Sequence, residues 1–354
     1  MSEEIKLGRR NFLGTAALAT AVADLCMLSF AKAESGENNQ GILISAKSGT
    51  AASFGPLKQI DAGVLSIGYA EAGPAAGPAV IVLHGWPYDI HSYIDVAPML
   101  AALGCRVIVP HLRGHGTTRF LDSTTPRSGQ QASIGADVIA LMDALKIRRA
   151  VLAGYDWGGR AACVAAALWP ERCAGLVSVN SYLIQDIAKA GLPAPAKVEA
   201  AFWYQFYFLT ERGRAGLTAN RRDIARIMWA RNSPTWQFDD ATFERSAIAF
   251  DNPDFVDVTL HSYRHRLGHA DGYSQYAELE KRLATLPLVT VPTITLDGAN
   301  DGVVPATDGK STAAKFTERE HRVLANVGHN PPQEDPAAFA AAVWKLASRN
   351  ETRS

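Results

Sequence analysis

The sequence predicts an α/β protein with a mostly parallel central sheet flanked by helices, and with a helical cap domain inserted into it. Three observations predict this class. From about residue 55, short apolar runs rich in β-branched residues alternate with stretches of helical periodicity. From about 181 to 284 the strand pattern disappears, and aromatic, arginine-rich helical segments replace it. Strands then resume, as expected of an α/β core that accommodates an insertion between two strands.

The core elements are predicted in the following order. Strands before the insertion are AVIVLHG (79–85), CRVIVPHLRGHG (105–116), RAVLAGYD (149–156) and AGLVSVN (174–180). Helices are predicted over 132–145 and over the run GGRAACVAAALWP, which Pro170 ends. After the insertion come strands over 291–301 and 321–330 and a last helix, PAAFAAAVWKLASR. This repetition predicts parallel strands covered on both faces, with ligands at their carboxyl ends.

The chain is predicted to divide into four parts. Residues 1–33 combine two adjacent arginines, a short apolar stretch and a terminal AKA, which is typical of a twin-arginine export signal. Residues 34–50 are predicted to form a flexible linker, residues 51–180 and 285–354 the α/β core, and residues 181–284 the cap. A periplasmic or secreted protein is therefore expected, with the twin-arginine export machinery as its partner during secretion.

The apolar stretch of the signal is shorter than the about 20 residues needed to cross a bilayer, so stable membrane anchoring is the less favoured alternative. Lysine plus arginine equal aspartate plus glutamate at 35 each, which provides no overall field to attract nucleic acid or an anionic membrane. If cleavage follows Ala33, Cys105, Cys163 and Cys173 remain, all in apolar segments. An odd number in such segments predicts buried thiols rather than a disulfide framework.

The stretch GYDWGG (154–159) joins a predicted strand to a predicted helix and carries Asp156 at its centre. This is the spacing of a nucleophile elbow, in which glycines relieve crowding at a sharp turn. A carboxylate at the start of a helix stays ionised near neutral pH and needs no general base for its first attack. It suits displacement at a saturated carbon that bears a leaving oxygen or halide. The alternative role for Asp156 is that of a helix cap.

Four motifs in this order resemble the α/β-hydrolase fold, and specifically its epoxide hydrolase branch. They are HGWP (84–87), GYDWGG, GANDGVVP with Asp301, and NVGHNPP with His329. The resemblance implies an enzyme without cofactor or metal that converts a small-molecule epoxide and water to a vicinal diol through a covalent ester on Asp156. His329 would activate the water that hydrolyses this ester, while Asp301 orients the imidazole.

The resemblance also assigns the groups around the reaction. The backbone N–H groups of Trp86 and Trp157 stand where the oxyanion donors lie. The segment YQFYF (204–208) resembles the first cap tyrosine segment and HSYRHR (261–266) the second, which places two proton donors at Tyr204 and Tyr263. Aromatic packing is the alternative reading of both tyrosines, and Tyr207 is the substitute for Tyr204. The histidine partner also has alternatives, Asp297 and Asp186, on neighbouring strand ends.

Two rival functions remain open. A haloalkane dehalogenase shares the aspartate nucleophile and holds the departing halide with indole N–H groups. Trp157 fits that arrangement and cap tryptophans could complete it, but Trp86 and Pro87 stand where the family's asparagine donor would be. A binding protein that keeps the fold without chemistry is the other rival. It is disfavoured because the sequence retains every expected member of the triad.

Two further clusters have both a structural and a functional interpretation. His261, His265 and His269 lie four apart, which suggests a metal site, but Gly268 is expected to end their helix and no other ligand completes the set. Arg113 in HLRGHGTT could steer a substrate carboxylate, but a structural turn is the favoured interpretation.

Overall fold

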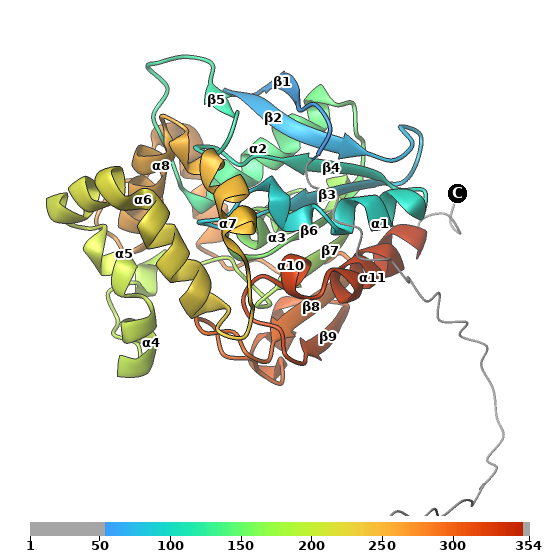
Figure 1. Ribbon diagram of the computed structural model, residues 1–354. Helices are drawn as coiled ribbons and strands as arrows, with labels where there is room; N and C mark the ends of the chain where they lie inside the picture. The colour runs from blue at the N-terminus through green and yellow to red at the C-terminus, as the bar shows by residue number, and fades with distance from the viewer. Residues whose placement is uncertain (1–53, 350–354) are drawn as a thin grey trace, which may run out of the picture. The chain divides into compact units, whose positions relative to one another are not determined.

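A nine-stranded, mostly parallel sheet organises the protein, which we describe from a computed structural model over residues 54–349 (Figure 1). Its order is β1-β2-β4-β3-β6-β7-β8-β9, with β5 paired to β2. Strand β2 is antiparallel to β1, β4 and β5, whereas the pairs from β4 through β9 are parallel. The strands are β1 (Lys58–Ala62), β2 (Leu65–Ala72), β3 (Ala79–Leu83), β4 (Arg106–Pro110), β5 (Arg119–Phe120), β6 (Ala150–Gly154), β7 (Cys173–Val179), β8 (Thr293–Gly298) and β9 (Arg319–Leu324).

Helices cover both faces of this sheet. Helix α1 packs against α11 on one face, and α2 packs against α3 on the other (Figure 1). The core helices are α1 (Val96–Ala102), α2 (Gln131–Ala144), α3 (Asp156–Leu168), α10 (Pro331–Glu334) and α11 (Pro336–Ala347). Because both faces are covered, strands β3 and β6 contain no polar side chain, and every residue of β6 is buried.

The segment between β7 and β8 is helical, as predicted. Its helices are α4 (Ala196–Ala201), α5 (Trp203–Tyr207), α6 (Glu211–Asn232), α7 (Asp240–Ala247), α8 (Phe255–Arg266) and α9 (Ala277–Leu283). Helices α4 to α8 gather on one side of the sheet (Figure 1), whereas α9 packs against α2 and α3. The predicted fold class, a mostly parallel sheet with a helical insertion, is confirmed. The proposed residue limits of the cap stay a prediction, and α9 lies with the core layer.

Several details differ from the sequence prediction. The strand expected over 321–330 ends at Leu324, because the residues that follow form the loop before α10. The antiparallel strands β1, β2 and β5 were not among the predicted elements, since only the β-branched core runs give a strong strand pattern. Cys105, Cys163 and Cys173 are buried thiols, as expected.

The predicted signal (1–33) and linker (34–50) lie outside the described residues and stay predictions. Within residues 54–349, none of the helices combines the length and apolar character needed to cross a bilayer.

Candidate active site

Asp156 lies at a sharp turn between β6 and α3. Its φ of +51° falls in the left-handed region, where the backbone of any residue other than glycine is strained. Neighbouring glycines allow the turn: a Cβ at Gly158 would lie 2.0 Å from the carbonyl oxygen of Leu83, and one at Gly154 would lie 2.6 Å from the carbonyl carbon of Gly158. The close packing of α3 on β3 therefore holds Asp156 at the carboxyl edge of the sheet. Its side chain keeps 20% of its surface accessible.

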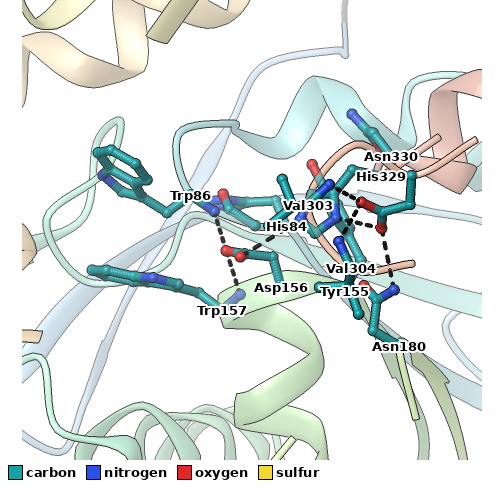
Figure 2. Close-up of polar contacts among 12 residues, drawn as sticks. His84, Trp86, Tyr155, Asp156, Trp157, Asn180, Val303, Val304, His329 and Asn330 are labelled. Atoms are coloured by element: carbon teal, nitrogen blue, oxygen red, sulfur yellow. Dashed lines mark hydrogen bonds and ion pairs between the residues drawn. The ribbon is translucent and has the colours of Figure 1, made fainter. Parts of the chain in front are cut away.

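Two backbone donors hold one oxygen of this carboxylate (Figure 2). Asp156 Oδ1 accepts hydrogen bonds from the N–H of Trp86 at 2.8 Å and from that of Trp157 at 2.6 Å. The loop after β3 can come this close because Gly85 has no side chain, since a Cβ there would lie 2.8 Å from Asp156 Cβ. Asp156 is therefore more than a helix cap: it joins two loops, and the same donors could hold an oxyanion on its carboxyl carbon.

His84 fixes the loop that supplies the first of these donors. Its Nε2 accepts a hydrogen bond from the N–H of Leu112 at 3.1 Å, so its Nδ1 carries the proton and donates to the carbonyl oxygen of Gly85 at 2.9 Å. Complete burial lowers the pKa of His84 well below its ordinary value, which keeps the ring neutral. Sequence reasoning assigned no role to His84, although it belongs to the HGWP motif.

His329 lies between two carboxylates. Its Nδ1 is 2.8 Å from Asp301 Oδ2, and its Nε2 is 3.6 Å from Asp156 Oδ2, the oxygen that the backbone donors leave free. Asp301 is held in turn by the N–H groups of Val303 and Val304, both on Oδ1, and by Asn180 Nδ2 at 3.2 Å from Oδ2. The segments that follow three strands thus bring Asp156, His329 and Asp301 together, with the imidazole between the two carboxylates. The contribution of Asn180 was not anticipated.

The three groups favour a charged pair. Burial alone would lower the pKa of His329, but the charge of Asp301 and the contact with Asp156 raise it to about 10. Burial would likewise raise the pKa of Asp156, yet His329 and the two backbone donors lower it below its ordinary value. Near neutral pH the resting site therefore holds an ionised Asp156 beside an imidazolium.

Tyr204 and Tyr263 lie over the same region from the cap. Their rings meet edge to face with centroids 5.3 Å apart, and both contact the indole of Trp86. Burial raises both pKa values, and the negative charge of Asp156 raises them further, so both hydroxyls keep their protons at neutral pH. Each oxygen accepts a hydrogen bond, Tyr263 from Trp157 Nε1 at 3.3 Å and Tyr204 from Gln205 Nε2 at 3.4 Å. Each phenol therefore retains a proton that it can donate.

Other candidates from the sequence point elsewhere. The hydroxyl of Tyr207 lies against α6, where a Cβ on Gly216 would be 1.9 Å from it, so Tyr207 does not replace Tyr204. Asp297 accepts hydrogen bonds from Thr307. Asp186 forms an ion pair with the ammonium group of Lys189 at 2.8 Å.

Arg113 is a structural residue. Its guanidinium binds both carboxylate oxygens of Asp137 at 2.6 Å and the carbonyl oxygen of Ser128 at 2.7 Å, while its side chain is fully buried. The possible substrate contact by Arg113 is therefore not supported. His261 is also held by backbone, since its Nδ1 accepts a hydrogen bond from Gly129 at 3.1 Å.

The histidine cluster of the cap is not arranged around a common centre. Helix α8 ends at Arg266 and Gly268 has a φ of +76°, so His269 lies beyond the helix that carries His261 and His265. Over residues 54–349 the structure contains no group of three or more histidine, cysteine or acidic side chains spaced to hold a metal ion.

The order of the strands, the aspartate elbow and the histidine loop agree with a comparison to known families. The family model for the α/β hydrolase fold matches residues 78–336. The chain belongs to this family. This α/β hydrolase is similar to a protein of Klebsiella pneumoniae whose structure is solved and which is provisionally named an epoxide hydrolase. The two sequences are 55% identical. The match covers 84% of this chain and 100% of that chain, with a TM-score of 0.82.

Curated relatives of this α/β hydrolase are also named epoxide hydrolases. Epoxide hydrolase B of Mycobacterium tuberculosis is 31% identical over 150 residues, which cover 39% of this chain and 41% of that protein. The match thus spans about two fifths of the relative's length. Epoxide hydrolase A of the same organism is 24% identical over 323 residues, covering 83% of this chain and 98% of that protein. These relatives support a hydrolase that resembles epoxide hydrolases.

Proposed function

We propose that this α/β hydrolase opens small-molecule epoxides to vicinal diols, with Asp156 as a covalent nucleophile. The observation that carries the proposal is that the two oxygens of the Asp156 carboxylate have different surroundings. Oδ1 is held by two backbone donors, whereas Oδ2 is 3.6 Å from His329 Nε2. An ionised oxygen so placed can attack carbon, and the neighbouring histidine can serve the later hydrolysis.

In the first step, Oδ2 of Asp156 bonds to one ring carbon of the epoxide while the bond from that carbon to the epoxide oxygen breaks. The oxygen takes up a proton from Tyr204 or Tyr263, which replaces a poor leaving group by a hydroxyl. The products of this step are an alkyl ester on Asp156 and a tyrosinate that is reprotonated from solvent. Two buried phenols that accept hydrogen bonds and keep their own protons at neutral pH suit this role.

In the second step, neutral His329 takes a proton from water, and the resulting hydroxide adds to the carboxyl carbon of the ester. The N–H groups of Trp86 and Trp157 stabilise the oxyanion that forms on the former Oδ1. Collapse breaks the bond between the carboxyl carbon and the alkyl oxygen, and the imidazolium returns its proton to that oxygen. The diol leaves, and the carboxylic acid formed on Asp156 passes its proton to neutral His329, which restores the carboxylate and the imidazolium.

The ionisation of the site connects these two steps. His329 is an imidazolium beside ionised Asp156, so it cannot act as a base before alkylation. Ester formation removes the negative charge of Asp156, which is one of the contributions that raise the histidine pKa. His329 therefore releases its proton to solvent more readily once the ester is present, which balances the proton that the tyrosinate takes up and provides the neutral base that the second step requires.

The arrangement of the indoles favours an epoxide over a halide leaving group. A dehalogenase needs indole N–H groups directed at the departing halide. Here Trp86 Nε1 donates to Thr259 Oγ1 at 3.0 Å, Trp157 Nε1 to Tyr263, and Trp229 Nε1 to the carbonyl oxygen of Pro87 at 2.7 Å. A halide would have to displace these acceptors, which costs hydrogen bonds.

The test is to trap the ester. The substitution His329→Gln should allow alkylation and block hydrolysis, so intact protein gains the mass of the epoxide. In wild-type protein, a single turnover in ¹⁸O-water should place the label in Asp156. Absence of both adduct and label across a panel of epoxides, with diol still formed, would establish direct attack of water. A parallel panel of haloalkanes, with halide release as the readout, tests the other leaving group.

We also propose that the protein is exported in its folded state to the periplasm or beyond. The adjacent Arg9 and Arg10 before a short apolar stretch support this proposal. Replacing both arginines by lysine should leave the protein in the cytoplasmic fraction, while wild type appears in the periplasmic fraction or medium. Equal distribution of the two forms would contradict it.

A further inference from the structure

The carboxyl end of helix α6 is inserted between the two loops that carry the histidine and its aspartate. The carbonyl oxygen of Asn232, the last residue of α6, accepts a hydrogen bond from the N–H of Gly302 at 2.9 Å, directly after Asp301. The next residue, Ser233, accepts a hydrogen bond on Oγ from the N–H of His329 at 3.1 Å. One end of a cap helix therefore binds both loops of the base.

The fit between this helix end and the loops is close. A Cβ at Gly302 would lie 1.9 Å from the carbonyl oxygen of Arg231, and one at Gly328 would lie 2.7 Å from the Cα of Ser233. These glycines flank the two functional residues, since Gly302 follows Asp301 and Gly328 precedes His329. The absent side chains thus allow cap backbone to contact catalytic-loop backbone directly.

A half-buried carboxylate completes the junction. Glu334 Oε1 accepts hydrogen bonds from Ser233 Oγ at 2.6 Å and from the N–H of Asn330 at 3.0 Å, and its Oε2 accepts one from the N–H of Gly328 at 2.6 Å. Together, Ser233 and Glu334 receive the three consecutive N–H groups of residues 328–330. Hydrogen bonds to a carboxylate are stronger than neutral ones, so this unit sets the position of the histidine loop. Since the Ser233 hydroxyl donates to Glu334 and accepts from His329, it links the two segments.

The nucleophile is held differently. Asp156 and the N–H groups of Trp86 and Trp157 belong to core segments, and the cap reaches this group through side chains only, as in the bond from Trp86 Nε1 to Thr259. The end of α6 also contacts the loop of Trp86, because Trp229 Nε1 donates to the carbonyl oxygen of Pro87 at 2.7 Å. A change confined to Ser233 or Glu334 should therefore loosen the loop of His329 while leaving Asp156 and its backbone donors in place.

We propose that Ser233 and Glu334 are positioning residues that hold the loop of His329 for the hydrolytic step and are not required for the alkylation step. The inference rests on the proposed function. A displacement of about 1 Å at a reacting group can cost about a hundredfold in rate. Ser233→Ala should therefore slow ester hydrolysis by about tenfold to a hundredfold and leave alkylation within about twofold.

The experiment is a single-turnover measurement with an epoxide that wild type turns over, in which intact mass follows the ester on Asp156. Ser233→Ala and Glu334→Gln should accumulate the ester, and Ser233→Thr should restore hydrolysis because it keeps the hydroxyl. The matched control is Thr235→Ala, an exposed hydroxyl on the same segment that binds Asn300 Nδ2 at 3.3 Å and should behave as wild type. Equal slowing of both steps, or no accumulation in either variant, would overturn the inference.

A second readout separates this inference from the proposed function. If neither wild type nor His329→Gln forms an ester, the proposed function fails. The positioning role is then decided by NMR of ¹⁵N-histidine-labelled protein. The sheltered Nδ1 proton that His329 shares with Asp301 should exchange faster in Ser233→Ala and stay protected in Thr235→Ala. Unchanged protection in Ser233→Ala would refute the positioning role whatever the chemistry.

Discussion

The core side and the cap side of the site are built in different ways. On the core side, Asp156 and His329 follow strands and are held by directional hydrogen bonds: Asp156 accepts from two backbone N–H groups, and His329 donates its N–H to Ser233 and contacts Asp301 through Nδ1. On the cap side, Tyr204 and Tyr263 are held mainly by ring packing around Trp86. Directional bonds fix atoms to a fraction of an ångström, whereas packed rings tolerate small shifts. The proposed attack thus depends on core backbone, and the proposed hydrolysis depends also on Ser233 at the end of α6. The cap rings form the side on which substrate preference can change.

The largest effect is expected from the core carboxylate. Asp156→Ala removes the proposed nucleophile and should lower diol formation by at least about 10⁴-fold, measured as kcat/KM. The thermal midpoint should remain close to that of wild type, because the variant also relieves a buried charge. Residual activity within about a hundredfold of wild type would show that the core side does not supply the attacking atom.

A smaller effect is expected from the cap tyrosines. Tyr204→Phe and Tyr263→Phe should each slow epoxide opening by about tenfold to a hundredfold, and the double variant by more, because each removes one proton donor. Rapid-quench measurement of ester formation isolates this step. Tyr207→Phe is the matched control, since its hydroxyl lies against α6. Unchanged rates of ester formation in the double variant would show that the two tyrosines only pack in the cap and donate no proton.

The two sides should also differ in how they accept one added methyl group. Gly158→Ala places a Cβ 2.0 Å from the backbone oxygen of Leu83 and should destabilise the fold by about 2–3 kcal/mol. In Gly216→Ala of α6, the nearest atoms to the added Cβ are the hydroxyl and ring edge of the half-buried Tyr207, a side chain that can shift. Alanine's helix propensity offsets the contact, so the change should stay within about 1 kcal/mol. Urea denaturation gives both values. Equal losses of unfolding free energy in the two variants would contradict the view that the core is more tightly packed than the cap.

The same difference explains what could be predicted from the sequence. The order of core strands and the turn at Asp156 follow from local patterns, namely β-branched runs and a glycine-flanked aspartate, so they were predictable. The contact between His329 and Asp301, at 2.8 Å, also agrees with the expected partner of the histidine. It could be expected because Asp301 follows a parallel strand, which must end at the same edge of the sheet. These features depend on residues that lie close together in the sequence, and such local patterns can be recognised without the structure.

What could not be predicted depends on contacts between distant segments. The bond from Asn180 to Asp301 and the junction of Ser233 with Glu334 join residues about a hundred positions apart, and no local pattern marks them. The antiparallel strand β2 was missed because its run LSIGYAEA mixes small and polar residues. The cap tyrosines were located only by resemblance, since tyrosine in a helical segment is usually packing.

The finest test compares the charge state of the core side before and after alkylation. Asp156→Asn imitates the neutral ester, so the pKa of His329 should fall from about 10 toward its ordinary value of 6.5. NMR titration of the imidazole measures it. Because the folded wild type holds this proton more tightly than the unfolded chain, its contribution to stability is complete below pH 6.5 and is lost as pH rises toward about 10. The variant should lose part of that slope in urea denaturation between these limits, because Asp301 remains beside the imidazole. A histidine that still titrates near 10 in Asp156→Asn would mean that Asp301 alone holds the proton, and ester formation would then not release the base.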